Sequence, residues 1–363
     1  MSWICLSAPG ETLFAPAGLD ARHDAPPLVD TGVDALLPRG SIVIETAISP
    51  GKRPQPLIHL ERDGAWPMHL SVQSIPGGGI SLVINQGGAI THGSIGQPQS
   101  GRLDRLRITY SWDAPRRWGQ LALESTDGAR FDLTAIRAPQ PLRLVDLRAL
   151  NGGNAFVAPD VAYIAVSTAI EPVGPMPTLT PDTPIATPET YVRAGALRRG
   201  DLVLTAAGDV VPVLYALTRT VPARGSFRPV RMRAPYFGLQ QDIVVSPAQR
   251  LVISGSVVDY MFATEAVLVN ACHLIGGTAA ARVHDPGATV TYTQVLLPGH
   301  EALIAAGTAV ESLHIGRLRR HKARLAASLL AGLDRARLPE HGRAVHPVLR
   351  AFDALVLAEQ RAA

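Results

Sequence analysis

The strongest constraint on the fold is a series of short segments in the first half of the chain in which apolar and polar residues alternate. Residues 40–48, 68–75 and 80–84 have this pattern, and a Pro-Gly-Gly-Gly turn separates the last two. A period of two residues is typical of a half-buried strand, and a glycine-rich turn between two such segments predicts a hairpin. Similar segments follow at 57–60, 106–113, 119–124, 141–147 and 161–166. Regularly spaced short strands of this kind predict a β-sandwich of the jelly-roll type.

The composition agrees with a mainly β protein and excludes several classes. Glycine and proline account for 33 and 30 of 363 residues, which favours frequent turns over long helices. The hydrophobic fraction of 47% is high enough for ordinary packed cores and excludes wholesale disorder. The net charge of +4 is far below that of a dense basic surface, so we expect no nucleic-acid partner.

Cysteine content and hydropathy narrow the cofactor and location classes. Cys5 and Cys272 are the only cysteines and lie far apart, so neither a disulfide framework nor a cysteine metal site is expected, and we predict no cofactor and no metal. No run of 18 apolar residues is present, so we expect no membrane span. Residues 1–7 lack the basic and apolar parts of a signal peptide, which leaves a cytoplasmic location and export without an N-terminal signal both open. The oligomeric state is also open.

A proline-rich segment predicts a domain boundary. Residues 171–177 hold three prolines, and such segments are stiff, extended and unable to join a central strand. We therefore expect a β-sandwich over 1–170, a linker over 171–177, a second domain over 178–316 and a tail over 317–363. Apolar residues at helical spacing predict that the tail is helical at 317–330 and 347–357.

The sandwich region resembles a known class of binding domains. Residues 107–113, followed by a short loop and the strand at 121–124, resemble concanavalin A-like and laminin-G-like sandwiches. The resemblance implies that this domain binds a glycan or a protein. Trp112 is either a stacking platform for a sugar or a core or rim aromatic, and the second interpretation is the more common one.

The second half carries several motifs in a recognisable order. A Gly-Asp turn precedes an apolar strand at 200–204, the sequence Ser-Pro-Ala-Gln occupies 246–249, and Gly-His-Glu occupies 299–301. Read together over roughly 178–316, these motifs resemble the bacterial Hint domain, which hedgehog C-terminal domains and inteins share. The resemblance implies an all-β, horseshoe-like domain with two pseudo-symmetric halves. It also implies an autoprocessing centre in which a first-residue nucleophile attacks the preceding carbonyl and a histidine protonates the leaving amide nitrogen.

The sequence departs from the family pattern at both of these positions. Thr178 stands where the family has cysteine, and Gln249 stands where it has histidine. An alcohol needs a strong base beside it to act as a nucleophile, and a glutamine amide does not deliver a proton at pH 7. The centre is therefore predicted to be degenerate.

Three further residues match positions of the family centre. Ser246 either keeps a backbone-positioning role or starts a turn before Pro247. His300 is either a residual general base or a buried, hydrogen-bonded structural residue, and the second is favoured. Asp242 precedes the Ser-Pro-Ala-Gln motif and is a candidate for orienting backbone amides.

Two hypotheses follow. In the first, the chain is a binding or scaffold protein with a lectin-like N-terminal domain and an inactive Hint domain. In the second, the chain cleaves itself slowly between Pro177 and Thr178 by an N–O acyl shift and releases the N-terminal domain. They differ in whether the backbone stays intact at residue 177, and the enzyme class is left open accordingly.

Overall fold

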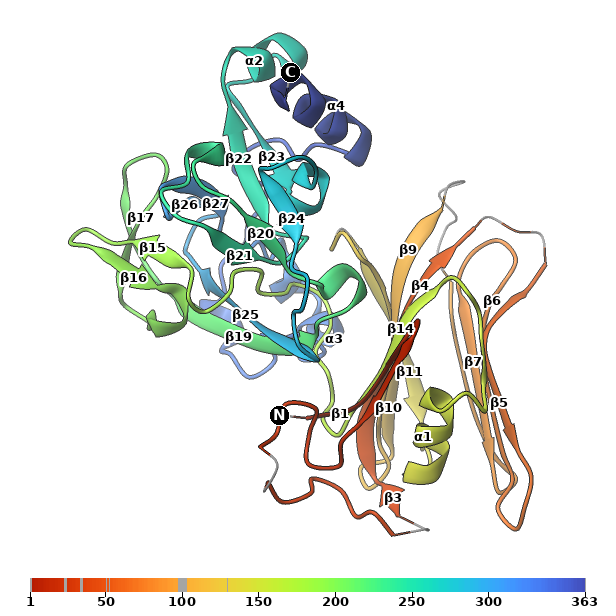
Figure 1. The fold of residues 1–363 in the computed structure, drawn as a ribbon. Coiled ribbons are helices and arrows are strands. Elements are labelled where there is room, and N and C mark those ends of the chain that lie inside the picture. The colour runs from red at the N-terminus through yellow and green to blue at the C-terminus, as the bar shows by residue number, and fades with distance from the viewer. Residues whose placement is uncertain are drawn as a thin grey trace. The chain divides into compact units, whose positions relative to one another are not determined.

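The computed structural model describes residues 2–22, 25–32, 35–49, 51, 53–96, 103–128 and 130–362. The chain divides into two compact units, Met1–Gly174 and Pro175–Ala363, both built mainly of antiparallel strands (Figure 1). The predicted mainly β class, with an N-terminal sandwich and a short C-terminal helix, is confirmed. None of the helices in the described ranges has the length and apolar character needed to cross a membrane.

The first unit is a sandwich of two main sheets. One has seven strands in the order β11-β10-β9-β4-β14-β1-β2, the other has five in the order β13-β5-β6-β7-β8, and β3 pairs with β12. The strands are β1 (Trp3–Ala8), β2 (Glu11–Phe14), β3 (Leu36–Leu37), β4 (Arg39–Ile48), β5 (Gln55–Arg62), β6 (Met68–Ser74), β7 (Ile80–Gln86), β8 (Ala89–Ile95), β9 (Asp104–Asp113), β10 (Trp118–Ser125), β11 (Phe131–Arg137), β12 (Leu142–Arg143), β13 (Phe156–Val157) and β14 (Val161–Ser167).

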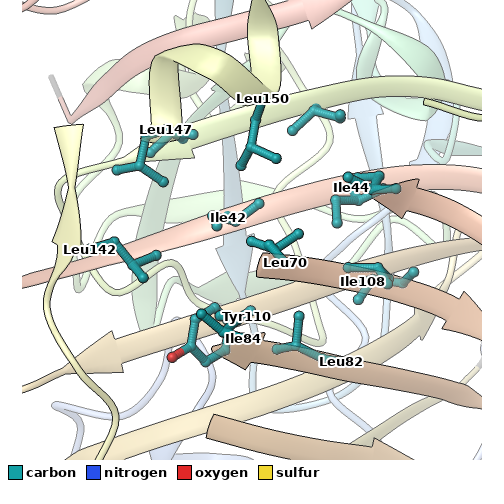
Figure 2. Packing of buried hydrophobic residues seen from close by; sticks show 14 of the residues in the cluster. Ile42, Ile44, Leu70, Leu82, Ile84, Ile108, Tyr110, Leu142, Leu147 and Leu150 are labelled. Atoms are coloured by element: carbon teal, nitrogen blue, oxygen red, sulfur yellow. The ribbon is translucent and has the colours of Figure 1, made fainter. Parts of the chain in front are cut away.

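The core of this unit lies between the two sheets (Figure 2). Alternate residues of each strand point inward, so that Ile42 and Ile108 of the larger sheet pack in the same cluster as Leu70 and Leu82 of the smaller one. Each such side chain, once fully buried, contributes about 1.5–3 kcal/mol of hydrophobic stabilisation. The period of two residues in the sequence thus has its physical cause in this shared core.

One predicted strand is wrong. Residues 141–147 form only the two-residue strand β12, after which the helix α1 (Leu144–Asn151) begins. Leu144, Leu147 and Leu150 recur every three residues and are all buried, which is the spacing of one helical face rather than of a strand. Conversely, the turn-rich N-terminal region contains β1 and β2, which extend the seven-stranded sheet beyond β14.

Trp112 is a core residue and not a surface platform for a sugar. Its side chain is fully buried, and its indole nitrogen donates a hydrogen bond to the carbonyl oxygen of Leu37 at 3.0 Å. The neighbouring Asp113 accepts a hydrogen bond from the amide of Arg116 at 3.2 Å, as a turn-forming aspartate does.

The second unit contains four sheets. Their strand orders are β16-β15-β26-β27-β22-β23, β17-β18, β19-β25 and β21-β20-β24. The strands are β15 (Pro184–Ala186), β16 (Tyr191–Arg193), β17 (Leu202–Leu204), β18 (Val210–Pro212), β19 (Tyr215–Pro222), β20 (Val230–Met232), β21 (Ile243–Val245), β22 (Arg250–Ser254), β23 (Ala266–Asn270), β24 (Ala280–Arg282), β25 (Thr289–Leu296), β26 (Ala302–Ala305) and β27 (Thr308–Glu311). The α-helices are α2 (Ser256–Phe262), α3 (Lys322–Ala326) and α4 (Ala351–Ala362), and short 3₁₀ turns occur at 194–196, 225–227, 236–238, 271–274, 318–320 and 335–337.

The C-terminal region is packed into this unit. Ala354 and Leu357 of α4 are buried in the same cluster as the sheet residues, and Leu268 of β23 exchanges backbone hydrogen bonds with Pro347 and Leu349. The continuous helix expected over 317–330 is replaced by a 3₁₀ turn and α3, and the last helix starts at Ala351 rather than at Pro347. The backbone of 347–349 is extended because it pairs with a strand, which an isolated helical pattern does not reveal.

Candidate functional site

The backbone of Thr178 is held between two strands. The carbonyl oxygen of Thr178 accepts a hydrogen bond from the amide of Ser246 at 2.7 Å. Leu179 and Thr293 exchange two backbone hydrogen bonds, at 3.1 and 2.7 Å. The residue predicted as the nucleophile is therefore fixed between the end of β21 and the middle of β25.

The Thr178 hydroxyl lies between two glutamine side chains. It donates to Oε1 of Gln249 at 2.6 Å and accepts from Nε2 of Gln294 at 3.3 Å. Both amides are buried, with 1% and 2% of their surfaces exposed. The proton and one lone pair of the hydroxyl are thus both engaged by neutral groups.

The two glutamines share one further acceptor, the backbone carbonyl of Glu311. Nε2 of Gln294 donates to it at 2.8 Å and Nε2 of Gln249 at 3.2 Å. Gln249 also donates to the carbonyl of Arg250 at 2.8 Å, and Gln294 to Oε1 of Gln249 at 3.2 Å. We call Thr178, Gln249, Gln294 and the Glu311 carbonyl the amide centre.

The side chains that hydrogen-bond the Thr178 hydroxyl in the described part of the chain are two neutral amides. A primary amide is neither a base nor an acid near neutral pH, so Gln249 accepts the hydroxyl hydrogen bond without removing the proton. An alkoxide or a well-placed base is needed for a hydroxyl to attack a carbonyl.

Gln294 was missed by the sequence analysis. It follows Tyr292 and Thr293 on β25 and precedes the apolar residues Val295 and Leu296. A lone amide in a buried strand must find hydrogen-bond partners, and this signal points to a polar contact inside the fold. Its Oε1 atom has no hydrogen-bond partner within the described part of the chain.

Ser246 is buried and organises the turn that carries Gln249. Its hydroxyl accepts a hydrogen bond from the amide of Ala248 at 3.3 Å, and its carbonyl accepts from the amide of Gln249 at 2.9 Å. Burial raises the pKa of the neighbouring Tyr292 hydroxyl, against a smaller opposing effect of its hydrogen bond with Ser246. Through its own amide Ser246 also holds the Thr178 carbonyl.

Asp242 is exposed and lies at the start of β21. Its Oδ1 atom accepts a hydrogen bond from the backbone amide of Ala234 at 3.0 Å, which fixes the loop after β20. In the part of the chain that the structure describes, no hydrogen bond joins Asp242 to Thr178.

His300 contacts a different set of groups. Its Nδ1 atom accepts a hydrogen bond from the amide of Val345 at 2.9 Å, and its Nε2 atom lies 3.1 Å from Oε1 of Glu311. Nη1 of Arg250 is 2.9 Å from the same carboxylate oxygen. Burial alone would raise the pKa of the Glu311 carboxyl. The hydrogen bond from His300 and the charge of Arg250 outweigh this effect and keep that pKa below its usual value.

Three of the five predicted site residues therefore come together, and two do not. Thr178, Ser246 and Gln249 are joined by hydrogen bonds, whereas Asp242 holds a loop and His300 lies on the side-chain side of Glu311. Glu311 connects the regions because its backbone carbonyl serves the amide centre and its carboxylate serves His300. Among the described residues no group of three or more His, Cys, Asp or Glu is arranged to hold a metal ion.

The sandwich has its own buried polar group on the side of the larger sheet away from the core. Arg107 lies 3.7 Å from Glu45 and 3.8 Å from Glu124, and Glu124 accepts a hydrogen bond from the amide of Gly174 at 2.7 Å. Although burial works against its charge, nearby Tyr163, Glu124 and Glu45 hold the pKa of Arg107 above its ordinary value. These charges fix the end of the proline-rich segment to the sheet.

Comparison with known proteins identifies the second region. A family model described as a Hint domain matches residues 177–317, so this segment is a Hint domain. No curated protein matches the chain.

The chain is also similar to several solved structures. The MchDnaB-1 intein is 20% identical, with 37% of this chain and 98% of that chain covered and a TM-score of 0.26. The LG1-3 region of the laminin alpha2 chain is 10% identical, with 87% and 57% covered and a TM-score of 0.24. Domains LG4-5 of the mouse laminin alpha1 chain are 9% identical, with 86% and 75% covered and a TM-score of 0.20.

Proposed function

We propose that the Hint domain of this chain keeps its fold without the self-cleavage reaction, and that the intact chain acts as a binding or scaffold protein through its β-sandwich. The observation that carries this proposal is the placement of the Thr178 hydroxyl between the amides of Gln249 and Gln294. Each step of the reaction needs a proton movement that these groups do not perform.

An N–O acyl shift at this site has a defined balance of bonds and protons. Thr178 Oγ1 would attack the carbonyl carbon of Pro177, the Pro177–Thr178 amide bond would break, and an ester would form. The hydroxyl proton must leave and the departing nitrogen must gain a proton. Gln249 occupies the place beside the hydroxyl at 2.6 Å and does neither at neutral pH.

The binding role rests on the exposed face of the five-stranded sheet. His59 and His69 stand edge to face at 5.0 Å, Asn85 pairs with His69, and Phe156 pairs with His59. These side chains point away from the core, and Phe156 is 51% exposed. Two imidazole groups beside an exposed aromatic ring offer the hydrogen bonds and the apolar contact that a glycan or a peptide needs.

The second candidate function is slow self-cleavage between Pro177 and Thr178. The observation that favours it is the retained hydroxyl, whose backbone is fixed by Ser246 and Leu179 at the family's nucleophile position. A cleaving chain would release the sandwich, and an intact chain would keep it attached.

The test uses the freshly purified full-length protein. Its intact mass is followed for several days at pH 7.5 with and without hydroxylamine and dithiothreitol, and the same sample is then applied to a glycan array. We expect one unchanged 38.5 kDa species that binds a subset of glycans. Fragments that end at Pro177 and begin at Thr178 would instead support self-cleavage. An intact chain that binds no glycan would restrict the binding role to protein partners.

A further inference from the structure

Three histidines from distant parts of the second unit pack their rings against one another. The ring centroids of His300 and His314 are 4.7 Å apart, those of His300 and His341 are 5.7 Å apart, and those of His314 and His341 are 5.9 Å apart. His300 follows β25, His314 follows β27, and His341 belongs to the C-terminal region. The group thus joins the Hint domain to the region that follows it.

The hydrogen bonds of this group fix the protonation of two rings. Nδ1 of His300 accepts from the amide of Val345 at 2.9 Å, and Nδ1 of His341 accepts from the amide of Ile315 at 3.3 Å. Nε2 of His341 lies 3.2 Å from the carbonyl oxygen of Leu297, which only accepts, so Nε2 carries the proton. Each Nδ1 atom is therefore an unprotonated acceptor that faces a backbone N–H group.

The charged groups that contact the three rings lie beside His300. Glu311 of β27 lies 3.1 Å from Nε2 of His300, and Arg250 of β22 lies 2.9 Å from that carboxylate. His314 faces both other rings, and its Nε2 atom is buried without a hydrogen-bond partner in the described part of the chain. The carboxylate of Glu311, already shared with Arg250, thus faces His300 and acts on the neighbouring His314.

These bonds hold residues 341–349, which we call the latch segment. At one end His341 also donates its amide to the carbonyl of Gly316 at 3.0 Å. At the other end Pro347 and Leu349 pair with Leu268 at 2.8 and 3.0 Å. The middle of the segment, at Val345, is tied to the Hint domain by the bond to His300.

We propose that His341 and His314, packed against His300, form an acid-sensitive latch that releases residues 341–349 from the Hint domain when these two imidazoles are protonated. A protonated Nδ1 atom of His341 becomes a donor that faces another donor, the amide of Ile315, so this hydrogen bond is lost. Positive His314 and His341 rings, with centroids 5.9 Å apart, also repel each other. The buried apolar side of α4 keeps the end of the chain attached, so the opening is local.

The pKa values of the histidines while residues 341–349 are bound determine how the stability of the latch depends on pH. Burial, aided by the neighbouring His300 and His314, lowers the pKa of His341 to about 4, and burial, aided by the neighbouring His300, also lowers the pKa of His314. An opened histidine returns to about 6.5, so the open state binds more protons and the latch is complete above this pH. The stabilisation is lost as the pH falls from about 6.5 towards 4. For His341 alone, the opening equilibrium increases roughly 30-fold between pH 7.5 and pH 5.

A metal site does not explain the same group. A metal bound to Nε2 of His300 would need that nitrogen deprotonated while Nδ1 already accepts from Val345. Both nitrogens of His341 are likewise engaged by backbone groups.

The experiment is amide hydrogen exchange of the full-length protein at pH 7.5 and pH 5.0, corrected for the intrinsic pH dependence of exchange. We expect peptides covering 341–349 to lose at least tenfold protection at pH 5.0, while peptides from β9 and β10 keep theirs. His341→Asn keeps an acceptor opposite Ile315 but does not titrate, so its pH response should fall below about threefold. The matched control His92→Asn, at an exposed position on β8, should keep the wild-type response.

Two results would overturn the latch. One is equal protection of 341–349 at both pH values in the wild-type protein. The other is a loss of protection at pH 5.0 that spreads evenly over β9, β10 and the latch segment, because this would be global unfolding. The wild-type comparison is decisive even where His341→Asn does not fold.

Discussion

The two polar groups that meet at Glu311 differ in their ability to move protons. On the backbone side of this residue, Gln249 and Gln294 hold the Thr178 hydroxyl with neutral amides. On the side-chain side, its carboxylate pairs with His300 and Arg250 beside two further histidines. The carboxylate of Glu311 thus contacts His300 and Arg250, whereas its backbone carbonyl accepts hydrogen bonds from the two glutamines.

Buried neutral amides and buried charged groups therefore have different roles in this domain. Neutral amides satisfy each other in a dry interior at little electrostatic cost, whereas charged groups need close partners and respond to pH. The amide centre therefore fixes geometry, and the histidine group fixes the C-terminal region in a pH-dependent way. Substitutions at the amide centre and at the histidine group should therefore change the free energy of unfolding by different amounts and with a different dependence on pH.

The largest stability effect is expected at the charged side. Glu311→Gln removes the carboxylate that faces His300 and Arg250, whose side chains are 2% and 18% exposed. Breaking a buried ion pair typically costs about 3–5 kcal/mol, because the remaining charge has no partner. Urea unfolding at pH 7.5 measures this loss, and the exposed Glu265→Gln serves as the control. A loss below about 1 kcal/mol would show that the ion pair is not important for stability.

A smaller effect is expected at the amide centre. Gln294→Met removes the donor shared by Thr178, Gln249 and the Glu311 carbonyl, but it also removes a buried Oε1 atom without a partner. We expect a loss of about 1 kcal/mol, at the low end of the range for unpaired buried groups. The loss should be equal at pH 7.5 and pH 5.5, because the lost groups do not titrate.

Urea unfolding at the two pH values measures it, with the exposed Gln241→Met as the control. A loss that differed between the two pH values would show a titrating group at the amide centre, and the contrast between the two sides of Glu311 would not hold.

The sequence predicted those features that repeat along the chain. Period-two alternation placed most strands of the sandwich, since each inward side chain joins one shared core. The predicted strand at 141–147 was wrong because this segment is short. Three leucines at helical spacing lie in it, and a segment of this length does not distinguish helical from strand periodicity. The short β3, β12 and β13 depend on partners far away in sequence, which no local pattern reveals.

The site was predictable where a motif carried it. Thr178 and Gln249 were identified as the altered positions of a resemblance, and the structure joins them directly. Gln294 and Glu311 were not found, because their roles arise from strands that meet only in the fold. His300 was singled out, but its contacts with Val345 and His341 lie in a region that the sequence represented only as a helical tail.

The most direct test of the central claim is the rescue of cleavage. Thr178→Cys combined with Gln249→His supplies a thiol and a proton donor at the two altered positions, and the intact mass is followed with dithiothreitol and hydroxylamine. We expect cleavage after Pro177 in the double variant and none in the wild type, with either single substitution far slower than both together. Cleavage of the wild-type protein at the same bond would contradict the proposed loss of reaction. So would a double variant that folds and stays intact, because the loss of reaction would then not lie in these two side chains.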